Sequence, residues 1–246
     1  QSHTTGNFVW KSFPTRDDQP PDFYICDPID PRAAWMTGAF AGDGTLVMLG
    51  STLHVWQSCP KGSSDRPLLS VSGYRFLGGD GASIAIAGAK LYVSLYNGNK
   101  VVVYNQLPKD PSKSPDYAIG SPDIHTNTLD THYMVTNGVP ATDGKSLFVS
   151  SDFDRKMYVW KHLPNESGAF PDIVYSLPSA PWDNELFGNM LVLAGRDTVF
   201  IWDGLPVDGS LPDRVLVGSI GGVRLSDIRG VALDATYFYL ADAGQN

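Results

Sequence analysis

The sequence predicts an all-β fold, a β-propeller of four-stranded antiparallel blades, and three observations carry this prediction. An aromatic residue followed by proline four positions later recurs five times, each time before a polar stretch, a second proline and a short apolar run. These aromatic anchors are Trp10, Trp56, Tyr104, Trp160 and Trp202. Their spacing of 42 to 56 residues, filled by short strands, is typical of propeller repeats.

The copy around Tyr104 shows the expected strands of one blade. Apolar or alternating runs predict strands at 83–88, 90–96, 100–107 and 117–120, with a tight Asn-Gly turn between the second and third. Small residues in the first run suit an innermost strand, because inner strands converge on the propeller axis. The anchor lies in the third strand, so we expect each anchor ring to be buried between adjacent blades, worth ~2–3 kcal/mol.

The two prolines of each copy mark strand ends. Proline lacks the N–H that a central strand would use, so the first proline ends the third strand and the second begins the outermost one. In four copies an aspartate follows the second proline: Asp22, Asp116, Asp172 and Asp213. We expect these carboxylates to serve turns or exposed strand edges, where charge also discourages edge-to-edge aggregation.

The two ends of the chain carry complementary parts of a repeat. The first anchor, Trp10, has no inner pair of strands before it, and residues 228–246 form an inner pair without an anchor. We therefore expect residues 8–10 to pair with residues 237–241 and to close a ring of five blades. The count becomes six if the chain is a fragment of a longer protein. On either count residues 1–246 form a single β-propeller domain.

Composition limits the expected partners and location. The 246 residues carry a net charge of −8, and the pI is near 4.9. An acidic protein repels phosphate backbones, and no run approaches the roughly 20 apolar residues of a membrane helix. Neither nucleic-acid binding nor membrane insertion is therefore expected. Few charges, an acidic pI and many small and aromatic residues favour an extracellular or secreted protein.

The chain has two cysteines, which fall at different positions of the repeat. Cys59 takes a position that is apolar in every other copy, so we expect its thiol to be buried. Cys26 takes a position where the other copies carry Ser or Gly. A disulfide between Cys26 and Cys59, joining neighbouring blades, stays open as an alternative.

The segments 91–101 and 148–156 look like a signature of strand, polar turn, Asn, basic residue and strand, and the end of the chain at 239–246 (YLADAGQN) looks like it more closely. With these segments the chain resembles the NHL-repeat family, and YAIGSPD at 117–123 is similar to the outer strand of a secreted bacterial subset. The resemblance implies a propeller, usually of six blades, that binds or scaffolds. In a minority of the family it implies a lyase or hydrolase that uses a metal in the central channel.

A first group of candidate ligand-binding residues precedes the glycine of each inner strand. Thr37, Asp80, Asn137 and Arg229 hold this position, and the fourth copy has Asn184 or Glu185 nearby with an uncertain alignment. We expect these side chains to converge on the mouth of the channel, where such groups can bind a small polar ligand, an ion or water. A salt bridge between Arg229 and Asp80 that holds the ring is the alternative.

A second group lies in the insertion 121–136, which accounts for the longest spacing between anchors. It contains Asp123, His125, Asp130 and His132, and an insertion ahead of an inner strand is expected to project over one face near the axis. These residues can contribute to a metal or ligand site, or they form an ordinary polar loop. No cofactor is predicted, and a channel calcium or zinc ion stays open.

The sequence contains no nucleophile elbow, phosphate loop or zinc-protease motif. We therefore expect a noncatalytic extracellular propeller that serves as a binding or assembly module. Its partner would be a protein or a glycan, with self-association into an oligomer or filament included. The alternative is a metal-dependent lyase or hydrolase with its site in the channel.

Overall fold

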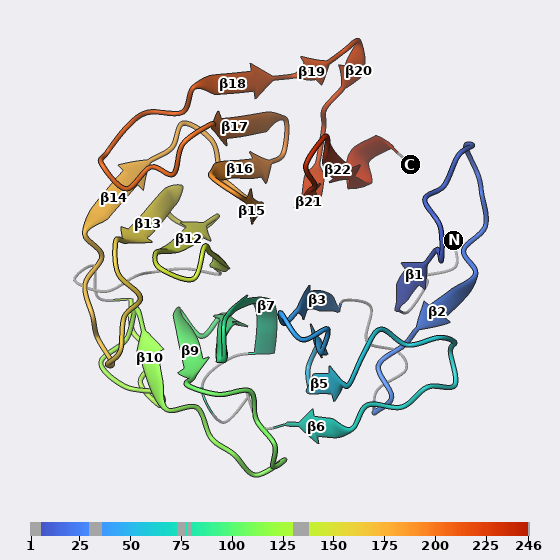
Figure 1. The fold of residues 1–246 in the computed structure, drawn as a ribbon. Helices are drawn as coiled ribbons and strands as arrows, with labels where there is room; N and C mark the ends of the chain where they lie inside the picture. Colours follow the sequence, from blue (N-terminus) through green and yellow to red (C-terminus); the bar gives the residue numbers. More distant parts are fainter. Residues whose placement is uncertain (1–5, 30–35, 73–76, 78–79, 130–137, 246) are drawn as a thin grey trace.

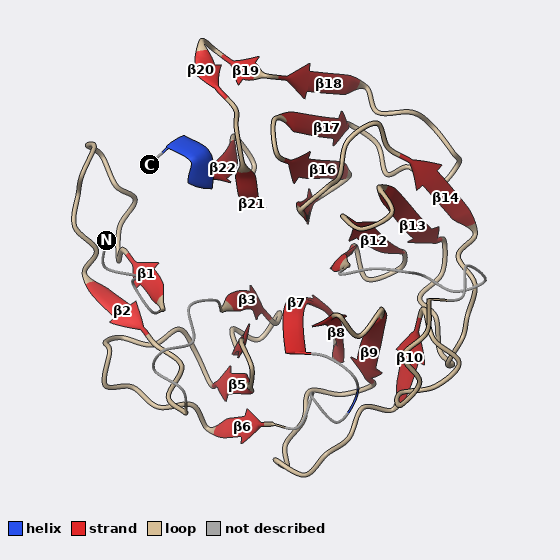
Figure 2. Cartoon of the chain, turned by 180° about the vertical axis from the view of Figure 1, so that it is seen from behind, coloured by secondary structure: helices blue, strands red, loops and turns tan. Residues whose placement is uncertain are grey.

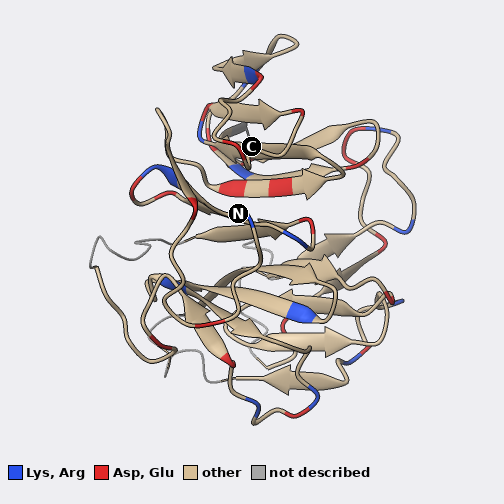
Figure 3. Cartoon of the chain, turned by 60° about the vertical axis from the view of Figure 1, so that its left-hand side comes forward, with Lys and Arg blue, Asp and Glu red and all other residues tan. Residues whose placement is uncertain are grey.

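The computed structural model describes residues 6–29, 36–72, 77, 80–129 and 138–245. Almost all regular elements within these ranges are β-strands, gathered in sheets that stand around a common axis (Figures 1 and 2). None of the described residues forms a helix with the length and hydropathy of a membrane span. Charged residues are scattered over turns and strands rather than gathered on one face (Figure 3).

Four sheets have four antiparallel strands each, hydrogen-bonded in chain order. Blade 1 contains β3 (Thr37–Phe40), β4 (Leu46–Leu49), β5 (Leu53–Trp56) and β6 (Leu69–Val71). Blade 2 contains β7 (Asp80–Ala87), β8 (Lys90–Tyr96), β9 (Lys100–Tyr104) and β10 (Tyr117–Ile119). Blade 3 contains β11 (Val139–Thr142), β12 (Leu147–Ser151), β13 (Lys156–Trp160) and β14 (Ile173–Ser176). Blade 4 contains β15 (Asp183–Phe187), β16 (Met190–Gly195), β17 (Thr198–Trp202) and β18 (Arg214–Val217). The predicted all-β propeller of four-stranded blades is confirmed.

The chain ends form smaller sheets. β1 (Asn7–Val9) pairs with β2 (Phe23–Ile25), and β21 (Ile228–Leu233) pairs with β22 (Phe238–Asp242). A separate hairpin joins β19 (Ser219–Ile220) to β20 (Val223–Arg224), and η2 (Ala243–Gln245) follows β22. The predicted pairing of residues 8–10 with 237–241 is not among the pairings of the described strands. Ring closure and the blade count are therefore not confirmed.

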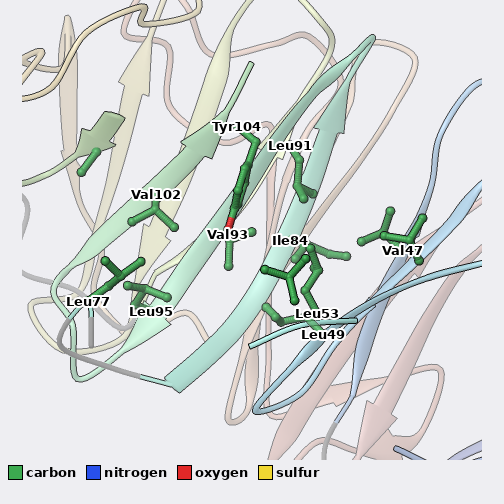
Figure 4. Packing of buried hydrophobic residues seen from close by; sticks show 13 residues of the cluster. Val47, Leu49, Leu53, Leu77, Ile84, Leu91, Val93, Leu95, Val102 and Tyr104 are labelled. Carbon is green, nitrogen blue, oxygen red and sulfur yellow. The ribbon is translucent and has the colours of Figure 1, made fainter. Parts of the chain in front are cut away.

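Apolar clusters fill the space between neighbouring sheets. Val47 and Leu53 of blade 1 share one cluster with Ile84, Val93 and Tyr104 of blade 2 (Figure 4). Similar clusters join blade 2 to 3, blade 3 to 4, blade 4 to β21, and β1–β2 to blade 1. The core of the molecule is thus divided among these wedges, which hold the inner strands around the channel.

Four of the five anchors fill these wedges as predicted. Trp56, Tyr104, Trp160 and Trp202 are between 0 and 4% exposed. Trp10 is only half-buried. Its sheet, β1–β2, has an apolar cluster on the side of blade 1, whereas each of the other anchors lies in a complete blade.

The repeated aspartates have one shared structural role. Each accepts, through Oδ2, a hydrogen bond from the backbone N–H of the residue that follows the anchor. The pairs are Lys11 to Asp22, Asn105 to Asp116, Lys161 to Asp172 and Asp203 to Asp213, at 2.7–2.8 Å. The aspartate therefore clamps the start of the outermost strand to the end of the third, in agreement with the expected structural role.

The prediction of a buried thiol at Cys59 is wrong. Cys59 and Cys26 are both exposed, and they are not joined by a disulfide. The repeat position of Cys59 lies beyond the end of the third strand, at the rim of the blade. Phe13, the counterpart in the first copy, is 68% exposed there. In the other blades Leu107, Leu163 and Leu205 at this position are half-buried and pack against the apolar clusters, so the position is partly covered rather than buried.

Candidate functional site

The inner strands β3, β7, β11, β15 and β21 line a central channel, and strand pairing shows which of their residues lie at one level. In each complete blade the reference is the residue of the second strand three positions after the one that pairs with the anchor, and its inner-strand partners are Thr37, Ser83, Val139 and Asp183. The sheet β21–β22 has no anchor, so its level is counted three positions along β22 from the pair Leu233 and Phe238, which reaches Gly230 opposite Ala241. We call these five residues the mouth ring.

The next level of the channel lies two residues further along each inner strand, and its residues are nearly all of one type. It consists of Ala39, Ala85, Ala141, Glu185 and Ala232. Four small side chains leave room around the axis, as expected of inner strands. Only Glu185 of blade 4 breaks the pattern, so both channel levels have their acidic residue on β15.

The mouth ring differs from the one that the inner-strand glycines predict. Thr37 belongs to it. Asp80 begins β7 opposite Tyr96, two pairs beyond the ring position Ser83, and the strand is irregular between Gly81 and Ser83. Arg229 lies at a similar irregularity beside the ring position, between Ile228 and Gly230. The glycine alignment therefore gives the wrong level for blade 2, and Asn137 lies outside the described residues.

A cavity of about 330 Å³ opens at the mouth ring. Its lining consists of Asn7, Met36, Thr37, Ala82, Ser83, Val139, Trp182, Asp183 and Arg229. A second cavity, of about 470 Å³, follows the channel between the five inner strands and includes Asp183 and Glu185. The mouth thus combines hydroxyl, amide, carboxylate and guanidinium groups with one indole, a set suited to a small polar ligand.

Arg229 is held in place at the mouth from two sides. Its guanidinium carbon lies 3.9 Å from the ring centroid of Trp182, a cation–π contact. Its Nε lies 2.9 Å from Oδ1 of Asp227. These two contacts fix the orientation of the one cation among the described residues that line either cavity.

Trp182 reaches the mouth because residues 180–182 lie directly on β16. The Trp182 N–H donates to the carbonyl of Ala194 at 2.7 Å. The next residue, Gly195, has no room for a side chain, since a Cβ there would lie 2.0 Å from the carbonyl oxygen of Ala180. The glycine at position 195 therefore allows residues 180–182 to pack closely against β16, which places Trp182 at the mouth.

The two carboxyl groups of β15 lie in the channel wall, on residues that are half-buried. Asp183 accepts hydrogen bonds from the N–H of Val231 at 2.8 Å and from its neighbour Asn184 at 3.0 Å. Burial nevertheless raises the pKa of Asp183 to about 7. Burial also raises the pKa of Glu185, whose Oε1 accepts from the N–H of Leu186. Each carboxylate is thus stabilised by backbone N–H groups alone among the contacts that the structure shows.

The described half of the insertion has a structural role. The carboxylate of Asp123 accepts hydrogen bonds from the N–H of His125 and from both the N–H and hydroxyl of Thr126, all within the loop. The buried Lys100 donates to the Thr126 carbonyl at 2.8 Å and so ties the loop to β9. His125 is exposed, no residue of 121–129 lines the mouth cavity, and Asp130 and His132 lie outside the described residues.

Sequence reasoning missed Trp182, Asp183, Ser83 and Asn7. The fourth inner strand has no glycine at its start, so an alignment on glycine passes over Asp183. The second strands carry a more reliable signal, because an apolar run precedes each anchor by a nearly constant distance. Counting from that run reaches Asp183 and Ser83 directly. Asn7 and Trp182 come from outside the inner strands, so no repeat position identifies them.

Comparison with solved structures supports the fold. A chain of a nidogen/laminin complex is 11% identical, with 86% of this chain and 73% of that chain covered and a TM-score of 0.55. The WD40 β-propeller domain of Doa1 is 13% identical, with 85% and 62% covered and a TM-score of 0.52. A provisional 6-phosphogluconolactonase from Bacteroides uniformis ATCC 8492 is 16% identical, with 89% and 65% covered and a TM-score of 0.57.

These similarities establish the propeller fold and no activity. The chain spans about three fifths of the length of the Doa1 domain. The similar structures include proteins named for complexes and proteins named for enzymes. No protein-family model matches the sequence, and no curated protein is significantly similar to it.

Proposed function

We propose that this chain is a noncatalytic extracellular β-propeller that binds a small polar group of its partner at the channel mouth. The observation that carries the proposal is the cavity in which Trp182, Arg229 and the mouth ring converge. Its size is within the range of small-molecule sites. Hydroxyl, amide and charged groups beside an indole suit a sugar unit of a glycan or a polar side chain of a protein.

The charge distribution supports this choice of partner. The net charge is −8, and Lys and Arg residues are scattered along the chain in the view of Figure 3. A polyanion such as nucleic acid would gain little from this surface. We therefore propose a protein or glycan partner, with no nucleic acid, no membrane insertion and no resident cofactor.

Self-association is a second part of the proposal. Phe8 and Tyr24 stack edge-to-face at 5.2 Å on β1–β2 and are 41% and 44% exposed. The counterparts of Phe8 in blades 2, 3 and 4 are buried, namely Val102, Tyr158 and Phe200, whereas the counterparts of Tyr24 in blades 3 and 4 are as exposed as Tyr24 itself. The exposed ring of Phe8, at a position that these blades cover, favours contact with another protein or a second copy. A mass that rises with concentration in light scattering would support it.

The metal-dependent lyase or hydrolase remains the alternative function. In the described ranges no three His, Cys, Asp or Glu side chains are placed to share a metal ion. Such a site would need residues beyond those ranges, for example Asp130 and His132. Elemental analysis of the purified protein that finds stoichiometric calcium or zinc would favour this alternative over the noncatalytic proposal.

The binding proposal is tested by screening the protein on arrays of immobilised glycans and peptides. Binding is expected to be lost in Trp182→Leu and in Arg229→Ala, and to persist in the matched surface variant Asn165→Ala. Hits that survive both mouth substitutions would move the binding site elsewhere. An absence of hits on both arrays would contradict the proposed function.

We infer further that the ring has six positions, as in most NHL-type propellers. β21 packs against β15, but it makes no packing with β3 comparable to that between β3 and β7. The sheets β21–β22 and β1–β2 also stand at different places around the axis (Figures 1 and 2). Both observations favour two separate positions for these sheets.

Engineered cysteines test this count. In a composite fifth blade Leu240 would face Phe8, as Leu193 faces Phe200 in blade 4. Under mild oxidation Phe8→Cys with Leu240→Cys is expected to form no disulfide. The control pair Phe8→Cys with Tyr24→Cys, which is opposite in β1 and β2, is expected to form one. A disulfide in the first pair would instead establish five blades.

A further inference from the structure

The outermost strands of two sheets are covered along their outer edge by a loop of the following sheet. In blade 3 the loop between the two prolines crosses β10 of blade 2, where the N–H of Ala118 donates to Oγ of Ser167 at 3.1 Å and the N–H of Gly168 donates to the Ala118 carbonyl at 3.1 Å. The same loop of blade 1 reaches β2, where the N–H of Tyr24 donates to Oγ of Ser63 at 3.2 Å. Both serines lie three residues after the first proline of their copy. The loop of one copy thus protects the outer strand of the copy before it.

The outermost strand of blade 4, β18, has no such cover. The sheet that packs beside blade 4 is β21–β22, which has no anchor and no loop of this kind in the described chain. Among the described strands β18 pairs with β17 alone, and no loop in the described ranges forms a hydrogen bond to Val215 or Val217. No described segment lies outside β18 in Figures 1 and 2. β18 is therefore an open sheet edge.

The register of β18 shows which backbone groups point outward. Val215 pairs with the residue two before its anchor, as do Ala118 in β10 and Tyr24 in β2. The N–H groups of Ala118 and Tyr24 point outward to the covering serines, so the N–H and carbonyl of Val215 point outward as well. Backbone direction alternates along an antiparallel strand, so Val217 presents a second such pair. The open edge thus offers two donors and two acceptors.

The side chains of this edge are apolar. Five residues after the second proline, the other copies carry a small or polar residue: Cys26, Ser72, Gly120 and Ser176. Strand pairing assigns Val217 to this position of the fifth copy, where it is 62% exposed, and Val215 is 46% exposed. The guanidinium of Arg214 is paired with Asp203 at 2.6 Å. Edge strands are usually protected by charge, proline or a bulge, and β18 has none of these at its two outward positions.

We propose that β18 pairs with β18 of a second copy across a two-fold axis, so that two blades join into one antiparallel sheet. With the axis at Leu216, Val215 of each copy lies opposite Val217 of the other, and each pair exchanges two N–H to carbonyl hydrogen bonds. The four valines become cross-strand neighbours on one face of the joined sheet. Arg214 lies opposite Gly218 of the second copy, so no like charges meet. An edge that complements itself in this way meets the requirement of a two-fold dimer, which favours a second copy over an unrelated strand.

This inference rests on the self-association in the proposed function and gives it a defined contact. The contact is separate from the exposed ring of Phe8, which belongs to β1–β2. A single short strand edge makes a small interface, so we expect a reversible dimer with a Kd of about 10–100 μM.

The first test is sedimentation velocity of the parent protein between about 1 μM and 1 mM, a range that brackets this affinity. The mass is expected to rise from one chain to two and to stop there. Hydrogen exchange at both ends of the range is expected to show that the amides of Val215 and Val217 exchange more slowly at the higher concentration. This measurement needs no substitution.

Three substitutions at one position separate strand pairing from other contacts. Val217→Pro removes an outward N–H that the single chain does not use, and Val217→Lys places a charge on the edge. Each is expected to weaken dimerisation at least tenfold. Val217→Thr keeps the N–H and the β-branched shape, and it is the matched control, expected to stay within about threefold of the parent. Near-ultraviolet circular dichroism checks that every variant keeps its tertiary packing.

Three outcomes would overturn the inference. They are a mass of one chain over the whole range, a dimer that persists in both Val217→Pro and Val217→Lys, and growth beyond two chains. If such a persistent dimer is lost in Phe8→Ser, the proposed self-association stands and its contact is β1–β2. If the protein stays monomeric but the arrays give hits that depend on Trp182 and Arg229, this inference fails while the binding proposal stands.

Discussion

The side-chain amide of Asn184 donates to the backbone carbonyl of Val139 at 2.8 Å, which joins the inner strand of blade 4 to that of blade 3. On the other side of the same strand, Asp183 accepts from the N–H of Val231 in β21. Inner strands have one edge without a neighbouring strand in their own sheet, so such side chains satisfy part of their exposed backbone. β15 therefore acts as the tie between three consecutive inner strands.

Asn184→Ala should destabilise the protein by about 1–3 kcal/mol, because it leaves the Val139 carbonyl and the Ser150 hydroxyl without this partner. Urea denaturation measures the change. Asn165→Ala, at an exposed asparagine, should stay within about 0.5 kcal/mol of the parent protein. Equal effects of the two substitutions would show that the inter-blade hydrogen bond contributes nothing.

Glu185→Ala should raise stability by about 0.5–2 kcal/mol. The substitution completes the alanine level of the channel and removes a half-buried carboxyl whose pKa is raised by burial. Thermal unfolding at pH 8 measures the change. A loss of stability would indicate that Glu185 supports the fold.

Asp183→Asn should change the pH dependence of stability. The folded-state pKa is raised from 3.8 to about 7, so the folded protein binds more protons than the unfolded chain between these values, and stability falls as pH rises through that window. Asp183→Asn has no carboxyl that titrates at this position, so its stability does not fall in this way as pH rises. Its free energy of unfolding relative to the parent should therefore be about 2–3 kcal/mol more favourable at pH 8 than at pH 5. Parallel curves for the two proteins would contradict the raised pKa.

Gly195→Ala should destabilise by about 1–3 kcal/mol or more, because its Cβ would overlap the backbone at Ala180 and Pro181. The shift of residues 180–182 should also displace Trp182 and weaken binding at the mouth. Gly62→Ala is the control, since a Cβ there meets no atom within 4 Å. Similar unfolding midpoints for both variants would show that the segment moves aside without cost.

Leu68→Asp should stabilise blade 1 by about 0.5–1.5 kcal/mol. Leu68 is 72% exposed and occupies the position that holds the clamping aspartate in four other copies. An aspartate there can accept from the N–H of Gln57, which follows the anchor Trp56. Leu68→Ala separates this gain from the mere removal of an exposed leucine. If both variants show the same stability, the clamp does not form.

The sequence predicts the blades well because anchors and prolines repeat for physical reasons that are the same in every copy. Trp56, Tyr104, Trp160 and Trp202 fill equivalent wedges, so their spacing gives the third strands directly. The exposed Cys59 shows the limit of this reasoning, because residue type does not reveal where the blade surface ends.

The candidate site is less predictable, because its level depends on local irregularities. The irregular pairing at Gly81 and Gly230 shifts the inner strands by about one residue, so the glycines do not mark equivalent levels. The approach of Trp182 depends on contacts with Gly195 from a neighbouring strand of the same blade. Asn7 reaches the mouth from a different sheet. None of these relationships has a repeating sequence signal.

The aspartate clamp also makes the outer loop of each blade independent of the two strands that it connects. The carboxylate joins the end of the third strand to the start of the outermost strand, on either side of the loop between the two prolines. This loop, the excursion of each copy, can therefore change in length and composition while both strand ends stay in place. The excursions of the five copies already differ in composition, and the one between Pro206 and Pro212 is one residue shorter than the other four. They are natural positions at which new surface segments can be acquired, or grafted in the laboratory, one blade at a time.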